Sequence, residues 1–128
     1  PKLGYDLLFS QYTTLLYTNE GDPYPYLVTG VLLNRTNTFS TMNDSLVFDS
    51  ITREQVVDFN YTDQLDAVGY DWKDVVGDVS SGVVYYEVKP ENNYIIKNRN
   101  GYIFKMRFIG FYNQSGEKGY PTIEFQKL

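Results

Sequence analysis

The chain has 128 residues, long enough for one compact domain and too short for two of ordinary size. It contains no His and no Cys, which excludes a Ser-His-Asp triad, a Cys nucleophile, a zinc site of the usual nitrogen and sulfur type, and a disulfide framework. Sixteen Asp and Glu outnumber eleven Lys and Arg, giving a net charge of -5, so we expect no nucleic-acid partner.

The N-terminal quarter predicts a β-hairpin. Residues 5–18 are dense in β-branched and aromatic side chains and contain no Gly or Pro, which indicates a strand. A cluster of turn-forming residues follows at 19–23, and residues 24–34 again have the composition of a strand. Gly30 interrupts this second strand and marks a bulge or a close approach of another segment.

The middle of the chain is more polar and predicts little regular structure. A short strand is expected near residues 38–42. Thr52 and Gln55 have the spacing of a capping box, so one or two helical turns are expected between residues 52 and 68. Gly69 is expected to end this region in a left-handed conformation, and residues 70–82 are predicted to form a loop.

The C-terminal third predicts an antiparallel sheet. Short strands are expected at 83–88 and 94–97, and Asn100-Gly101 predicts a hairpin with a type I′ turn. Residues 102–112 alternate between two faces, and residues 120–126 form the closing strand. We therefore predict a single domain over residues 1–128 that is all-β, mainly antiparallel, with one or two short helical turns around residues 52–68.

Acidic side chains are the only numerous groups that could act as general acids or bases. They gather at Asp63, Asp66, Asp71 and Asp74, where a hydrolase or a calcium site is conceivable. The spacing matches neither a pair of catalytic carboxylates nor a calcium-binding loop. Solvated or helix-capping carboxylates explain the pattern better, so we expect a protein that is not an enzyme.

The two methionines differ in their surroundings. Met106 lies in the alternating segment between two Phe residues, which is typical of core packing. Met42 lies at the end of a weak strand, where its thioether could bind haem iron or pack on neighbouring apolar residues. Tyr70 and Trp72 lie in the predicted loop, where they could stack on a flat ligand or close the edge of the core.

Several segments together resemble one known family. They are residues 5–13 (YDLLFSQYT), 23–34 (PYPYLVTGVLLN), 65–73 (LDAVGYDWK) and 116–121 (GEKGYP). The amino-acid sequences of these segments, and their order along the chain, resemble those of the HmuY-type haem-binding lipoproteins of Bacteroidetes. The resemblance implies an all-β fold that holds haem between loops, in an outer-membrane surface lipoprotein or shed, secreted hemophore. Such a protein takes haem from host proteins and passes it to an outer-membrane receptor for iron acquisition.

The same resemblance implies a site. The founding member holds iron with two His, and similar members use two Met. Met42 falls where the first ligand is expected, which makes it the candidate metal ligand, and Tyr70 is the nearest ligand-capable side chain in the second region, residues 68–80. Tyr70 and Trp72 are the other candidate haem-binding residues.

Two further expectations remain beside this one. The absence of His keeps open a surface module of the same fold that has lost haem and recognises another porphyrin, a glycan or a host protein. The chain begins at Pro1 and family members are longer at this end, so a lipid anchor is expected to lie outside this chain.

Overall fold

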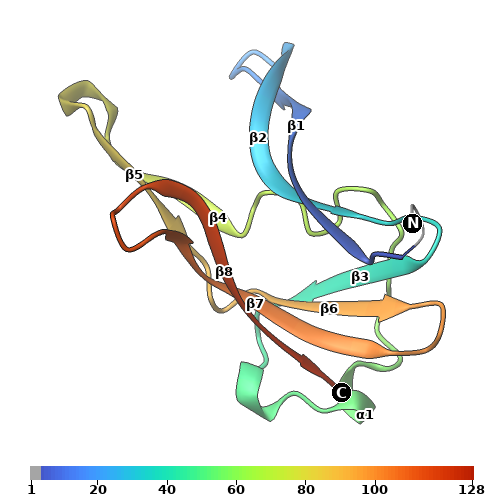
Figure 1. The fold of residues 1–128 in the computed structure, drawn as a ribbon. Coiled ribbons are helices and arrows are strands. Elements are labelled where there is room, and N and C mark those ends of the chain that lie inside the picture. The colour runs from blue at the N-terminus through green and yellow to red at the C-terminus, as the bar shows by residue number, and fades with distance from the viewer. Residues whose placement is uncertain (1–3) are drawn as a thin grey trace.

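The computed structural model describes residues 4–128, and strands dominate it (Figure 1). Strands account for 54% of the described residues and helical turns for 8%, which confirms the all-β prediction. The strands are β1 (Leu7–Tyr17), β2 (Pro23–Leu33), β3 (Thr38–Asn43), β4 (Lys73–Asp78), β5 (Val83–Val88), β6 (Asn93–Asn98), β7 (Ile103–Tyr112) and β8 (Lys118–Lys127). They form a four-stranded sheet of order β3-β6-β7-β8 and two hairpins, β1–β2 and β4–β5, and every pairing is antiparallel.

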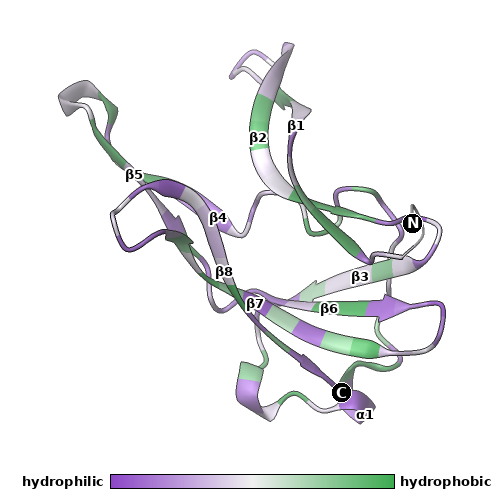
Figure 2. Ribbon diagram, viewed as in Figure 1, coloured by the Kyte–Doolittle hydropathy of each residue, from purple (hydrophilic) through white to green (hydrophobic). Residues whose placement is uncertain are grey.

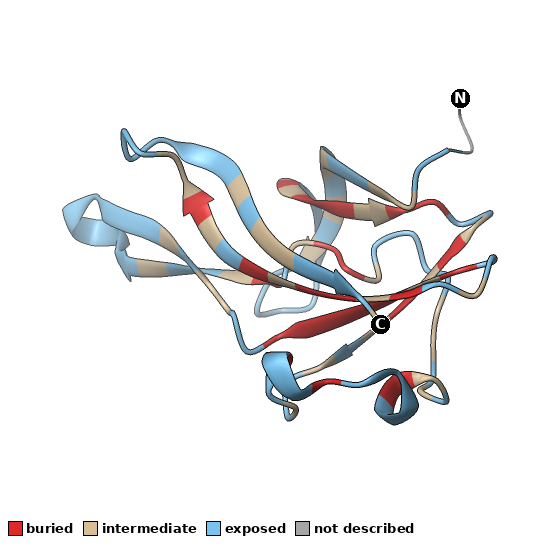
Figure 3. Cartoon of the chain, turned by 60° about the horizontal axis from the view of Figure 1, so that its bottom comes forward, coloured by how far each residue is buried: buried red, intermediate tan, exposed pale blue. Residues whose placement is uncertain are grey.

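The four-stranded sheet is covered on both faces. The larger core cluster lies on one face and includes Met106 and Phe108 of β7. The smaller cluster lies on the other face and includes Ile95 and Ile103. Met106 is only 2% exposed, which confirms its assignment to the core. Buried residues concentrate in this sheet, while the outer parts of the hairpins are mostly exposed (Figure 3).

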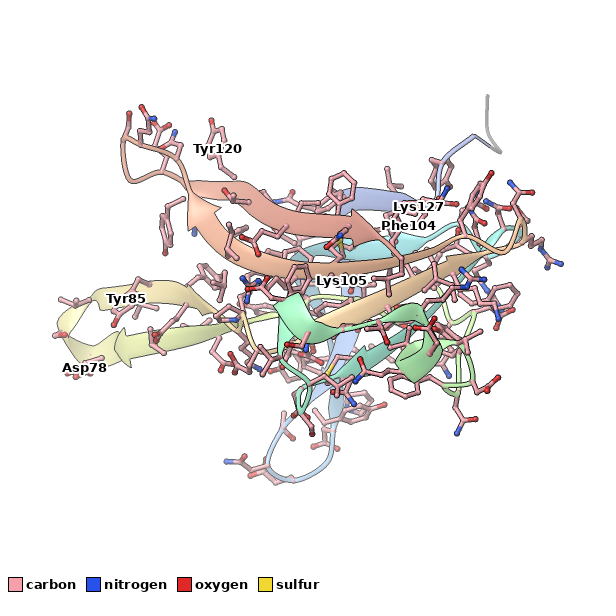
Figure 4. The ribbon with its side chains drawn as sticks, turned by 90° about the horizontal axis from the view of Figure 1, so that it is seen from below. Asp78, Tyr85, Phe104, Lys105, Tyr120 and Lys127 are labelled. Atoms are coloured by element: carbon pink, nitrogen blue, oxygen red, sulfur yellow. The ribbon has the colours of Figure 1, made fainter. Side chains whose placement is uncertain are left out.

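Lys105 is a buried cation on the second face of β7 (Figure 4). Its Nζ donates to the carbonyl oxygen of Phe48 at 2.6 Å and also lies 4.8 Å from the Phe48 ring centroid. A buried ammonium needs such partners, because leaving it unpaired away from water is costly. The contact therefore fastens the segment with the 3-10 turn η1 (Phe48–Ser50) beneath the sheet.

The β1–β2 hairpin follows the sequence-based prediction closely. The two strands pair without interruption from Leu7 with Leu33 to Tyr17 with Pro23. Near its base, Val31 and Gly69 form an isolated bridge, with reciprocal N–H to carbonyl hydrogen bonds of 2.9 and 3.0 Å. A Cβ at Gly30 would lie 2.5 Å from the Gly69 carbonyl oxygen, so Gly30 is the close-approach point that its position in the strand predicts.

The predicted loop over residues 70–82 is wrong over residues 73–78. Lys73–Asp78 forms β4 and pairs along its whole length with β5. The turn between them contains the 3-10 turn η2 (Val79–Ser81), where the Asp78 side chain accepts a hydrogen bond from the Ser80 N–H at 2.9 Å. Gly and Asp are typical of loops, but pairing with β5 supplies the hydrogen bonds that hold this segment extended.

Two smaller local predictions have different outcomes. The helix α1 (Arg53–Val56) begins after Thr52, whose N–H donates to Gln55 Oε1 at 2.9 Å, as the capping box predicts. The hairpin at Asn100-Gly101 is present, but its turn is not type I′. A type I′ turn needs a positive φ at both central residues, but within residues 4–128 no residue other than Gly has a positive φ. In this turn only Gly101 has one, 82°. Its N–H bonds to the Asn98 carbonyl at 3.0 Å, which gives a three-residue loop ending in a left-handed Gly.

Candidate functional site

A cleft of about 640 Å³ opens between the two hairpins, near the start of β8. Its lining residues come from β1 and β2 on one side and from β4, β5, β7 and β8 on the other, and these strands are labelled in Figure 1. Its volume is within the range of roughly 300–1,000 Å³ that is usual for small-molecule sites. The lining residues are Gln11, Leu16, Tyr24, Tyr26, Leu27, Val28, Thr29, Tyr70, Asp71, Lys73, Asp74, Val75, Tyr86, Phe111, Lys118 and Gly119.

The wall formed by β2 presents aromatic and apolar side chains. Tyr24 and Tyr26 are two residues apart, so both project from the same face of the strand. Their rings meet edge to face, with centroids 6.5 Å apart. Leu27 is 60% exposed beside them. In Figure 2, green segments of β1, β2 and β5 alternate with white and purple ones, so the hairpins carry separate apolar residues outside the central sheet. Such aromatic and apolar side chains can contact a flat ligand.

Trp72 is packed in the core beneath the segment that contains Tyr70, and it does not line the cleft. It is fully buried, and its ring stacks on Phe108 at 4.0 Å between centroids, with an interplanar angle of 10°. Its Nε1–H donates to the Gly69 carbonyl oxygen at 3.0 Å. Of the two possibilities drawn from the sequence, closure of the core is therefore the one that its position supports, because a ring enclosed in this way cannot stack on a ligand.

Tyr70 does line the cleft. The Gly69 bridge to β2 and the buried Trp72 fix the backbone on either side of it. Burial raises the pKa of the Tyr70 phenol, and the nearby carboxylates of Asp71 and Asp66 raise it further. The phenol is thus a neutral group at physiological pH that can stack or donate a hydrogen bond.

Met42 lies on β3, outside the cleft lining, and 47% of it is exposed. It pairs directly with Tyr94 of β6, so the two side chains share a face of the sheet. Burial raises the pKa of Tyr94 to about 12, and the charge of Asp71 contributes to this shift. Neither Met42 nor Tyr94 lines the cleft, so the structure does not bring Met42 and Tyr70 together in one cavity.

Cationic and anionic groups both reach the cleft. Lys73 and Lys118 supply the cations, and Asp71 and Asp74 the anions. Asp74 is paired with Lys89 at 3.1 Å. Burial lowers the pKa of Lys73 to about 8, although Asp71 partly opposes this shift. Within residues 4–128, no three His, Cys, Asp or Glu side chains are grouped so that they could hold a metal ion.

The sequence reasoning missed most of the residues that form the cleft. The alternation of Tyr24 and Tyr26 around Pro25 was a usable signal, since it places two rings on one strand face. Lys73 carried no local signal, because its role depends on the packing of β4 against the base of β2. Only Tyr70 was both predicted as a site residue and found in the cleft.

Comparison with known proteins gives one match. The family model described as HmuY protein matches residues 6–125, so the chain belongs to the HmuY family, which is a family of haem-binding, non-enzymatic proteins. No individual curated protein and no solved structure matches the chain significantly. No helix in the described residues has the length and apolar character needed to cross a membrane.

Proposed function

We propose that this chain is a non-enzymatic hemophore that holds haem in the cleft between the β1–β2 and β4–β5 hairpins. The observation that carries the proposal is the cleft itself, whose volume and aromatic lining suit a large flat ligand. Family membership supports haem as that ligand. Capture of haem at the cell surface, from host proteins among other sources, and transfer to an outer-membrane receptor complete the proposed role.

The residues present fit haem, with an unusual choice of iron ligand. In a chain without His or Cys, the thioether of Met and the phenol of Tyr are the remaining common side-chain ligands of haem iron. Met106 is buried in the core, whereas the Met42 side chain is accessible at the sheet edge. The cleft lining contains no Met, so a haem whose ring contacts Tyr70 in the cleft reaches Met42 on β3 only if the ring extends beyond the cleft lining. On that condition we assign iron ligation to Met42 and contact with the porphyrin to Tyr70. Trp72 acts indirectly, by holding the Tyr70 loop.

A thioether is a soft and uncharged ligand, so it favours ferrous over ferric iron. Haem bound through Met42 would be held more tightly under reducing conditions. Apolar contact and stacking on the cleft tyrosines contribute in both oxidation states, because they depend on the porphyrin and not on the iron.

The second candidate function is a surface module of the same fold that recognises another porphyrin, a glycan or a host protein. The observation that favours it is that Met42 lies outside the cleft lining. An iron-free porphyrin bound as tightly as haem would support this alternative, because the iron would then contribute nothing.

The two functions are separated by titrating the protein with haemin, with and without dithionite, and recording the visible spectrum. The haem function predicts a shifted Soret band and sharpened α and β bands on reduction. Spectra identical to those of free haemin in both states would contradict it.

Four variants assign the residues in the same titration. Met42→Ala should weaken ferrous binding most, and Met42→His should restore it and shift the preference towards ferric iron. Tyr70→Phe should weaken binding in both states. Tyr102→Phe, which alters an exposed tyrosine outside the cleft lining, is the matched control. If both Met42 variants bind like the parent, the iron is not held by Met42.

A further inference from the structure

Lys73 is a cation in the cleft that has no carboxylate partner. Its Nζ donates to the carbonyl oxygen of Thr29 at 2.5 Å and lies 3.5 Å from that of Tyr70. Within residues 4–128, the ion pairs are Lys89 with Asp74 and Arg107 with Glu124, so no carboxylate lies within ion-pair distance of Lys73. Asp71 acts on it only from farther away.

Aromatic rings surround the same ammonium group. Its Nζ lies 4.3 Å from the Trp72 ring centroid, 5.2 Å from that of Phe111 and 5.7 Å from that of Tyr86. This enclosure removes water from the amine, which is why burial is the main cause of its lowered pKa. A partly dehydrated charge interacts more strongly with an incoming anion than one on the open surface does.

Lys73 also joins the two walls of the cleft. Thr29 belongs to β2 and Lys73 begins β4, so the Nζ–carbonyl hydrogen bond connects one hairpin to the other. An ammonium group has three N–H donors, and the two carbonyl contacts leave one for a ligand. A group bound there touches both hairpins at once.

A second cation lies next to the first. Lys118 lines the same cleft, and its Nζ lies 5.7 Å from the centroid of the same Tyr86 ring that Lys73 approaches. The cleft thus has two ammonium groups near the Tyr86 ring, the enclosed one of Lys73 and the exposed one of Lys118. Of the two acidic lining residues, Asp74 pairs with Lys89 at 3.1 Å, whereas Asp71 is the carboxylate that opposes an incoming anion.

We propose that Lys73 is the specificity-determining residue of the cleft, where its ammonium binds a carboxylate carried by the ligand's aromatic ring system. This inference rests on the proposed function and adds a selection rule to it. Porphyrins with free carboxylates bind, whereas neutral esters of the same ring bind weakly. Lys118 contributes a weaker and more salt-sensitive attraction, because it is exposed.

The test compares protoporphyrin IX with its dimethyl ester, two iron-free rings that differ in carboxylate charge. Both are titrated by fluorescence against the parent, Lys73→Met and Lys73→Arg. Lys97→Met is the matched control, because Lys97 is also a half-buried lysine near a tyrosine ring, 5.4 Å from that of Tyr61, but does not line the cleft. Far-UV circular dichroism checks that each variant is folded.

The parent should prefer the diacid by about 10- to 100-fold, the range for one hydrogen bond to a charged group. Lys73→Met should remove most of that preference by weakening diacid binding alone, Lys73→Arg should keep part of it, and Lys97→Met should change nothing.

Equal affinity of the parent for diacid and ester overturns the inference while leaving porphyrin binding intact, whether or not Lys73→Met folds. Equal loss of both ligands in Lys73→Met also overturns it, because Lys73 would then only shape the cleft. Failure of the parent to bind haemin and both porphyrins overturns the proposed function as well.

Discussion

Replacing Gly30 with Ala tests whether the close contact between β2 and the Gly69 backbone positions the cleft. The added Cβ would lie 2.5 Å from the Gly69 carbonyl oxygen and 3.0 Å from Tyr12 Cε1. Ordinary contact begins at 3.4 Å, so the backbone at Gly69 must retreat. That retreat stretches both hydrogen bonds of the Val31–Gly69 bridge.

The expected cost combines two effects. Overpacking costs about 1–3 kcal/mol, and weakening two backbone hydrogen bonds adds about 0.5–1.5 kcal/mol each if they are lost. We expect the free energy of unfolding to fall by about 2–4 kcal/mol, since partial relaxation preserves some of these contacts. Haemin binding should also weaken, because Tyr70 follows Gly69 directly.

The assay is urea unfolding followed by circular dichroism, in which lower stability lowers the midpoint at unchanged slope. Gly110→Ala is the matched control, since a Cβ there meets only the Thr122 side chain at 3.5 Å. Its midpoint should stay close to that of the parent. Equal midpoints for Gly30→Ala and Gly110→Ala would refute the reasoning.

Two other substitutions give separate tests. Met106→Ala leaves a cavity in the larger core cluster and should lower the free energy of unfolding by about 2–5 kcal/mol; unchanged stability with lost haemin binding would instead make Met106 a ligand. Burial raises the pKa of Tyr94 from 10.0 to about 12, so the unfolded chain loses this proton first as the pH rises. Stability should therefore fall between pH 10 and pH 12, and Tyr94→Phe should reduce that fall; an unchanged pH dependence in Tyr94→Phe would contradict the assignment.

Local sequence signals predicted most of the strands. The β1–β2 hairpin, β3 and the alternation of β7 follow from composition and period, because each strand carries its own apolar pattern. The strand β4 was missed, because its Gly and Asp residues form a strand only when β5 is beside them. The turn at Asn100-Gly101 was misassigned in type, since the same dipeptide also suits a loop in which Gly101 alone has a positive φ.

The site was harder to predict than the fold. A cleft between two hairpins is made by contacts that cross more than forty residues, such as Lys73 with Thr29. Tyr70 was a candidate because it is an aromatic residue in a predicted loop and because the family resemblance expects a ligand within residues 68–80. The sequence left open whether Trp72 stacks on a ligand or closes the edge of the core, and only the packing on Phe108 shows that this ring is enclosed.

The central claim is that haem occupies the cleft between the hairpins, and NMR spectra of the ¹⁵N-labelled protein test it most directly. Paramagnetic haemin should broaden amide signals near its binding site, with gallium protoporphyrin as the diamagnetic control. The account predicts broadening at Tyr24, Tyr26, Tyr70 and Lys73, which line the cleft. Broadening confined to Ile123 and Phe125, in the smaller apolar hollow of about 250 Å³ on the central sheet, would contradict it.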